Sequence, residues 1–408
     1  MSRRALIIAF AFLAAAISGT AFLYAQSLRP NKPPQTNNIT GKQQLSGPYT
    51  HQNLTIFLIH GTDQNTDKPP LTLQEAMAQK KVIVHETGSV NELSIQNRSA
   101  EEVFVQAGDI VKGGQQDRVL ALDLILPPKS GRISIEAFCV EHSRWSQRGN
   151  EAVAAFSASD KMLATKGLKL AARNSLSQSE VWENVSLAQE KLARNFVAAK
   201  EPPRPVSGNP VAMATPIPPP TRANPPSNPE PHHVQRVSGG VLFTPNAGLT
   251  LGEQQGLTSV TSRVSPTSLQ LTLENKNVQE SAQQYLNKLS SIVQGKSDVI
   301  GFVFAINGEF NSADVYSSAA LFKKLWPKLL DASAVEAFAE YEANRAFAPV
   351  TKAEASAFLR EAESGKSDVK SIAPRTMLIK RETRQNLLFE TRDRQRGDGW
   401  LHRNYLAK

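Results

Sequence analysis

The sequence contains a single cysteine, Cys139, among its 408 residues. One thiol excludes an intrachain disulfide and any zinc site built from several thiolates. Strand alternation in the run 133–141 places this cysteine on the same face as Ile133, Ile135 and Ala137. We therefore expect a buried, unreactive side chain rather than a nucleophile.

Three common enzyme signatures are also incomplete. The run "IFLIHG" at 56–61 is similar to the strand and His-Gly turn of an α/β-hydrolase oxyanion hole, but no Gly-x-Ser-x-Gly elbow occurs in the chain. The two "GKSDV" segments, at 295–299 and 365–369, lack the first glycine of a phosphate-binding loop. The seven histidines form no metal-ligand spacing. We therefore expect no cofactor and no metal site.

Charge is present but not concentrated. The 46 Lys and Arg residues exceed the 37 Asp and Glu residues by nine, which favours acidic partners such as anionic lipids or envelope polymers. No dense basic run is interleaved with aromatic residues, so we expect no nucleic-acid partner. The possible partners that remain are an anionic small molecule and an envelope protein.

Residues 1–25 have the pattern of an export signal. Arg3 and Arg4 precede an apolar run from Ala5 to Ala25. The run could be cleaved after Ala25, which would leave a periplasmic or secreted protein, or it could stay as an inner-membrane anchor over residues 5–25. The arginine pair also resembles a twin-arginine signal. Membrane contact is expected only through this segment.

Two segments poor in apolar residues divide the rest of the chain. Residues 26–48 read as a disordered spacer. The stretch 202–231 holds 12 of the 25 prolines, and we interpret 201–239 as an extended linker or, alternatively, a docking segment for a partner groove. This division predicts a β-rich lobe at 49–200 and an α+β lobe at 240–408.

The first lobe contains short β-rich runs separated by turn residues, as in a mostly antiparallel sheet. Its single long helix is expected near 179–197, and Thr72 with Glu75 predicts a capping box on a short helix. The expected strands begin with "LTIFLI" and continue at 82–85, 93–96, 103–107, 118–126 and 133–141.

The second lobe mixes helices and strands. A helix is expected near 278–293, and Asn307-Gly308 between two alternating runs predicts a hairpin. A longer helix at 321–348 should kink or break at Pro327. Thr351 with Glu354 caps a further helix; two strands, "TMLIK" and "NLLFET", then lead to a basic tail. The fold class is α+β.

The stretch "GDIVKGGQQDRV" at 108–119 is the first candidate site. The pair Gly113-Gly114 could turn backbone N–H groups into one concavity that binds an anion, with Arg118 as a clamp. Alternatively, the pair makes a hairpin turn, and Asp117 and Arg118 form a local ion pair.

The segment "CVEHSRW" is the second candidate. Glu141, Arg144 and Trp145 follow a strand, so they could gather with other charged residues at one end of the sheet. The simpler alternative is an ion pair with Arg144 over the Trp145 indole.

These two segments, together with "GFVFAINGEFNSADVYSSAALFKKLWPKLL" and "RDRQRGDGWLHRNYL", resemble the ARG and rhodanese-phosphatase-superfamily-associated protein domain family of bacteria and archaea. The resemblance covers about 50–200 and 240–405 and implies that both lobes belong to one family unit. The family has no established reaction or cofactor, and its name suggests phosphatase-like and rhodanese-like partners. The residues at matching motif positions are Asp109, Gly113, Gly114, Gln116, Asp117, Arg118, Glu141, Arg144 and Trp145.

Two functions fit these observations. The first is an exported, non-catalytic scaffold that binds an anionic ligand or a partner protein through the glycine-pair turn and the Glu141–Trp145 segment. The second is a hydrolase in which Asp109, Asp117 or Glu141 acts as acid or base and Arg118 or Arg144 is the electrophilic clamp. An enzyme requires these groups to converge in a cleft, with a desolvated carboxylate near an arginine.

Overall fold

The computed structural model describes residues 44–63, 68–142, 144, 156–162, 165–200, 249–343, 345–397 and 399–408. The expected export signal, the proline-rich segment 201–239 and Trp145 lie outside these residues. The described residues belong to one compact unit. Within the described part, no helix has the length and apolar composition that a membrane crossing requires.

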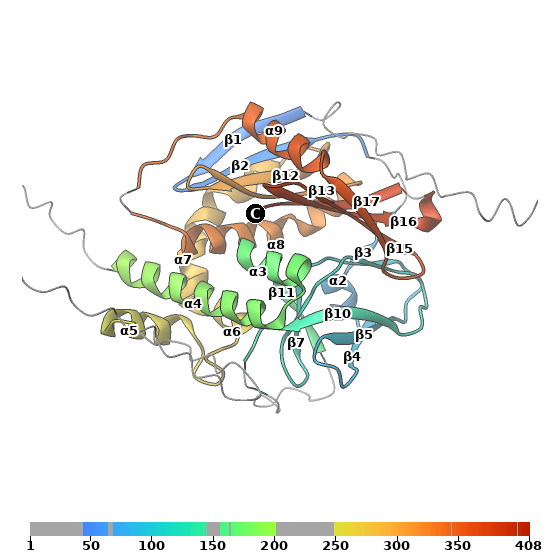
Figure 1. Ribbon diagram of the computed structural model, residues 1–408, viewed down its shortest axis with the longest axis horizontal. Helices are drawn as coiled ribbons and strands as arrows, with labels where there is room; N and C mark the ends of the chain where they lie inside the picture. Colours follow the sequence, from blue (N-terminus) through green and yellow to red (C-terminus); the bar gives the residue numbers. More distant parts are fainter. Residues whose placement is uncertain are drawn as a thin grey trace, which may run out of the picture. The chain divides into compact units, whose positions relative to one another are not determined.

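An eight-stranded antiparallel sheet forms the larger layer of the described chain (Figure 1). Its strand order is β1-β2-β12-β13-β17-β16-β15-β14. The strands are β1 (Gln44–His51), β2 (Leu54–His60), β12 (Val299–Ile306), β13 (Glu309–Tyr316), β14 (Lys366–Ser371), β15 (Thr376–Glu382), β16 (Asn386–Asp393) and β17 (Gly399–Ala407).

This sheet combines segments from both sides of the proline-rich stretch. β2, expected to open the first lobe, pairs along its length with β12. β1 begins at Gln44, inside the segment 26–48 whose composition predicts a spacer. It is a partly exposed edge strand held by backbone pairing to β2, so its side chains carry little of the apolar signal of a buried strand.

Two smaller sheets contain the other strands. A six-stranded sheet has the order β11-β7-β8-β10-β5-β4, and a three-stranded sheet has the order β3-β6-β9. The strands are β3 (Leu71–Thr72), β4 (Val82–Glu86), β5 (Glu92–Asn97), β6 (Val103–Val105), β7 (Asp109–Gly113), β8 (Arg118–Leu120), β9 (Leu124–Leu126), β10 (Ile133–Cys139) and β11 (Phe156–Met162). The single strand expected at 118–126 is therefore two strands in different sheets, separated by residues 121–123.

The structure contains each of the expected helices, together with α3, α5 and α6, which the sequence patterns did not predict. Both capping boxes are present, at Thr72–Glu75 and Thr351–Glu354. The helices are α2 (Leu73–Ala78), α3 (Lys166–Leu170), α4 (Gln178–Lys200), α5 (Leu251–Val260), α6 (Leu269–Leu273), α7 (Lys276–Leu289), α8 (Ala319–Ala339) and α9 (Lys352–Glu363), with short η2 (Ala171–Ser175), η3 (Ser290–Val293) and η4 (Arg394–Arg396). α8 continues through Pro327 and ends at Ala339 instead of Ala348.

Helices cover both faces of the large sheet (Figure 1). α9 packs on one face, where Phe358 and Leu359 belong to the same buried cluster as Val303 and Tyr405. α8, α3, α4 and α7 contribute to the core on the other face. Asn307 and Gly308 both have positive φ, so the turn that joins β12 to β13 is the hairpin that the sequence predicts.

The expectation that the chain ends in a basic tail is wrong. Residues 399–407 form β17, an interior strand between β13 and β16, and His402, Arg403 and Asn404 are buried. Buried cations of this kind are stable because carboxylates on neighbouring strands oppose them, as Glu390 Oε2 does at 2.5 Å from Arg403 Nε.

Candidate functional site

The glycine pair makes a hairpin turn. β7 pairs with β8 in antiparallel register, with Val111 opposite Arg118, and both glycines have positive φ. Two backbone N–H groups of the turn donate to carboxylates of the protein itself: that of Gly113 to Asp117 Oδ1 at 3.0 Å and that of Gln115 to Glu86 Oε1 at 3.0 Å. The turn thus already binds two internal anions.

The two candidate segments converge behind this turn. Arg144 Nε lies 2.7 Å from Glu141 Oε2, Arg144 Nη2 lies 3.9 Å from Asp117 Oδ1, and Arg144 Nη1 donates to the Gly114 carbonyl oxygen at 3.4 Å. Glu141 and Asp117 are completely buried. We call Asp117, Glu141 and Arg144 the hairpin cluster.

A later part of the chain closes the hairpin cluster. Ser268 Oγ donates to Asp117 Oδ2 at 3.1 Å, and Ser265 Oγ donates to Glu141 Oε1. The Leu269 N–H donates to the Val140 carbonyl oxygen at 2.9 Å and fixes the position of α6. Each carboxylate of the cluster therefore has a partner near it in the sequence and a serine donor from the distant segment 265–268.

Gln116 and Arg118 lie beside the hairpin cluster. Arg118 Nη1 donates to Gln116 Oε1 at 3.2 Å, and Arg118 Nη2 lies 3.8 Å from Glu86 Oε2. Gln116 Nε2 donates to the Glu141 carbonyl oxygen at 3.1 Å. The expected local pair of Asp117 with Arg118 is wrong, because neighbouring residues entering a strand point to opposite sides.

Asp109 does not join this group. It begins β7, at the opposite end from the glycines, and its Oδ1 accepts a bond of 2.7 Å from Lys328 Nζ on α8. Its Oδ2 accepts from the Gln106 N–H at 3.0 Å. Cys139 is completely buried, as the strand alternation predicts, and burial raises the pKa of its thiol to about 11.

A second buried polar group lies on the face of the large sheet toward α3 and α8. His402 of β17 is held between two carboxylates: Nδ1 lies 2.8 Å from Asp123 Oδ2, and Nε2 lies 3.1 Å from Asp314 Oδ1. Tyr316 stacks on the imidazole with 4.5 Å between ring centroids. Asp123 comes from residues 121–123, the break between β8 and β9, so the smaller sheets supply one of the two carboxylates.

The charges of this group stabilise one another. Burial lowers the pKa of His402, but Asp123 and Asp314 outweigh it and raise the pKa to about 9. Burial likewise opposes ionisation of Asp123, yet the charges of His402 and Arg173 hold the pKa of this carboxyl far below its usual range. The imidazole is therefore a cation at neutral pH and donates from both nitrogens.

Arg173 completes the group from η2, a single π-helical turn between α3 and α4. Such turns are frequent at functional sites. Its Nη1 donates to Asn404 Oδ1 at 2.6 Å, while Nε and Nη2 have no hydrogen-bond partner among the described residues. The nearest carboxylate oxygen, Asp123 Oδ2, lies 3.9 Å from Nη2. Burial lowers the pKa of Arg173, and Asp123 and Asp314 offset part of that effect.

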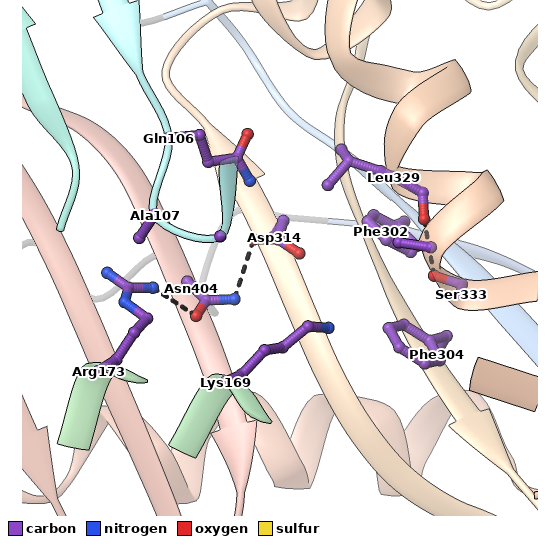
Figure 2. Close-up of a pocket in the computed structure, with 12 residues that line it drawn as sticks. Gln106, Ala107, Lys169, Arg173, Phe302, Phe304, Asp314, Leu329, Ser333 and Asn404 are labelled. Carbon is purple, nitrogen blue, oxygen red and sulfur yellow. Dashed lines mark hydrogen bonds between the residues drawn. The ribbon is translucent and has the colours of Figure 1, made fainter. Parts of the chain in front are cut away.

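A cavity of about 20 Å³ lies against this guanidinium, and we call it the sheet cavity. Its volume is close to that of one water molecule. Figure 2 shows Arg173 and Lys169 reaching from two helical segments toward Asn404 and Asp314, with Phe302 and Phe304 on the other side. Lys169 Nζ lies 3.4 Å from Ser312 Oγ and 5.5 Å from the centroid of the Phe304 ring.

The residue-by-residue interpretation missed the sheet cavity. Asp314, His402 and Asn404 lie in "NSADVY" and "GWLHRNYL", segments that carry the family resemblance, but no role was expected for them. The available signal is a polar residue at alternate positions of an otherwise apolar strand, since alternate residues share one face. Arg173 gave no comparable signal, because a π-helical turn has no simple sequence pattern.

The family comparison covers almost the whole described chain. The model of the ARG and Rhodanese-Phosphatase-superfamily-associated Protein domain matches residues 42–405. The chain belongs to this family. The matched range includes the first expected lobe and all but the last three residues of the second, so the hairpin cluster and the sheet cavity lie within one family domain. No curated protein and no solved structure shows significant similarity to the chain.

Proposed function

We propose that this member of the family is a non-catalytic binding protein for a small anionic ligand, and that the ligand places an oxygen in the sheet cavity. The observation that carries the proposal is the Arg173 guanidinium, which is buried beside the cavity with two N–H-bearing nitrogens that lack an acceptor among the described residues. A buried donor without an acceptor costs about 1–3 kcal/mol, and a carboxylate or phosphate oxygen would remove that cost.

The hairpin cluster supports anion binding less well. Two carboxylates face one guanidinium there, and the turn N–H groups already donate to Asp117 and Glu86. A further anion would have to displace an internal carboxylate against like-charge repulsion. We therefore propose that the ligand binds at Arg173 and not at the glycine-pair turn. The glycine-pair site stays a prediction.

We further propose that the protein acts outside the cytoplasm. The support is the sequence of residues 1–25, with two arginines followed by an apolar run. In this proposal 201–239 is an extended linker that joins the two parts of the family domain. Cell fractionation followed by N-terminal sequencing tests the export proposal, because a cleaved signal leaves a new terminus near residue 26.

The binding proposal predicts that orthophosphate, sulfate or acetate raises the melting temperature of the full chain at constant ionic strength. A ligand that binds only the folded state stabilises it by mass action. Arg173→Met should lose this stabilisation, because it removes the two donors. Arg194→Met, which removes the same charge at an exposed position of α4, is the matched control and should keep it.

Arg173→Met should still fold, because Asp123 retains its bonds to His402 and Thr391. Circular dichroism of both variants checks this point. A wild-type melting temperature that no anion of the panel changes would contradict the proposal, and so would equal stabilisation of both variants.

The alternative is a hydrolase centred on the hairpin cluster. The observation in its favour is Glu141, a desolvated carboxylate 2.7 Å from the Arg144 guanidinium. It predicts turnover of p-nitrophenyl acetate or p-nitrophenyl phosphate that Glu141→Gln abolishes and Arg173→Met retains. We rank it second, because Glu141 Oε1 and Oε2 are already bound to Ser265 and Arg144.

A further inference from the structure

A second and larger cleft is lined by Glu336, whose Oε2 lies 3.8 Å from Nζ of Lys169, a residue that lines the sheet cavity. It has a volume of about 340 Å³ and is lined by α3, α4, the β12–β13 hairpin and the C-terminal end of α8. Its volume is that of a small-molecule site. Glu336 and Asn311 line it, and both are more than nine-tenths buried.

The buried residues of this cleft contain two acceptor atoms without donors. Glu336 Oε1 accepts from Asn311 Nδ2 at 2.9 Å and from the Lys166 N–H. By contrast, Glu336 Oε2 and Asn311 Oδ1 have no hydrogen-bond partner among the described residues. The nearest cation to Oε2 is Lys169 Nζ at 3.8 Å. Both atoms belong to residues that line the cleft, so a donor that reaches them would satisfy them.

The charges around the cleft favour a cation. Four glutamates line it, against two lysines and one arginine; they are Glu309, Glu336, Glu340, Glu342, Lys166, Lys191 and Arg345. Glu340 and Glu342 are partly exposed and pair with Lys191 at 2.6 Å and Arg345 at 2.9 Å. Glu336 is the buried carboxylate of the set, so it gains most from a ligand that brings positive charge.

We propose that this cleft binds a small molecule through a primary ammonium group, which donates to Glu336 Oε2 and Asn311 Oδ1. An ammonium has three donors and no acceptor, which matches this arrangement. A metal ion fits less well, because the described residues contain no group of three metal-ligating side chains. The site is independent of the proposed anion site, although Lys169 lies next to both.

Isothermal titration calorimetry of the full chain with ethanolamine and with putrescine tests the proposal. Both amines should bind the wild type, and tetramethylammonium, a cation without N–H donors, should not. Glu336→Gln should lower the affinity at least tenfold. The matched control is Glu280→Gln, which removes the same charge from an exposed position of α7 and should leave the affinity unchanged.

Lys169→Met provides a test that misfolding cannot imitate. It removes a positive charge that lies 3.8 Å from Glu336 Oε2 and repels the ammonium group of the ligand, so amine affinity should rise on the order of tenfold. The same variant should weaken anion stabilisation at the sheet cavity, which separates the two sites. Absence of amine binding to the wild type, wild-type affinity in folded Glu336→Gln, or unchanged or lower affinity in Lys169→Met would each overturn the proposal.

Discussion

The hairpin cluster and the polar group beside the sheet cavity are both buried, and each places an arginine among carboxylates. The two sites differ in how the donors of that arginine are used. In the hairpin cluster, Arg144 contacts Glu141, Asp117 and the Gly114 carbonyl oxygen. Beside the sheet cavity, Arg173 makes one short bond, to Asn404. The contrast is one of distance: the nearest carboxylate oxygen lies 2.7 Å from Arg144 Nε but 3.9 Å from Arg173 Nη2.

This difference separates two roles of buried charge. A cluster whose charges satisfy one another holds segments of the chain together, as Asp117 and Glu141 do with α6 and the segment before it. A cluster in which buried donors lack acceptors lowers the free energy of unfolding unless a ligand or a water molecule supplies the acceptor. The following predictions test whether the hairpin cluster is structural and the sheet cavity is a binding site.

The largest difference is expected between two matched substitutions. Arg144→Met removes the guanidinium beside two buried carboxylates and should lower the free energy of unfolding by about 3–5 kcal/mol. Arg173→Met should lower it by only about 1 kcal/mol, because Asp123 keeps the positive charge of His402 beside it, whereas Ser268 and Ser265 are neutral donors. Urea denaturation of both variants measures the two changes. Equal losses would remove the proposed distinction.

The pH dependence of stability is the next largest effect and is specific to the sheet cavity. The folded pKa of His402, about 9, exceeds the unfolded value near 6.5. The contribution of protonated His402 to the free energy of unfolding is therefore complete below pH 6.5 and is lost as the pH rises through 9. The shift corresponds to about 3 kcal/mol.

Urea denaturation of the wild type at pH 6.5, 7.5 and 9 should show this decline, and His402→Gln should show a much flatter profile. Parallel profiles for the two proteins would contradict the assignment to His402. Arg144→Met, which leaves the imidazole and its two carboxylates in place, should retain the wild-type slope.

The smallest effect concerns the turn of the hairpin cluster. Gly114 has a φ of +57°, and an added Cβ would lie 2.4 Å from Phe156 Cζ and 2.5 Å from Glu86 Oε1. Gly88 has a φ of +82° with nothing near that position. Gly114→Ala should therefore lower the free energy of unfolding by about 2 kcal/mol and Gly88→Ala by about 1 kcal/mol, as measured by thermal denaturation. A larger loss at Gly88 would show that contacts at the turn matter less than backbone strain.

Local sequence patterns were sufficient for several elements. Asn307-Gly308, the capping pair Thr351–Glu354 and the periodicity near 278–293 depend on neighbouring residues alone. The structure contains the hairpin and the cap, and it forms α7 and then η3 over the periodic segment. The expected burial of Cys139 also follows from strand alternation and is confirmed. The fold class, α+β with extensive antiparallel sheets, follows from the order of these elements.

Pairing between distant segments did not follow from local patterns. Nothing near "LTIFLI" indicates that β2 pairs with β12, some 240 residues later, and nothing in "GWLHRNYL" shows that its charged residues are buried in β17. A charged residue in a strand has the same local pattern whether water or a buried carboxylate compensates it. The expected basic tail was wrong for this reason.

The sequence by itself determined short-range features of this protein: its capped and periodic helices, its two hairpin turns and its family. Only the tertiary structure decided that Asp109 leaves that group for Lys328, and that Asp123, Arg173 and His402, from three distant segments, meet beside one cavity. The physical reason is that local conformation depends on neighbouring residues, whereas the balance of buried donors and acceptors depends on the complete packing of the chain.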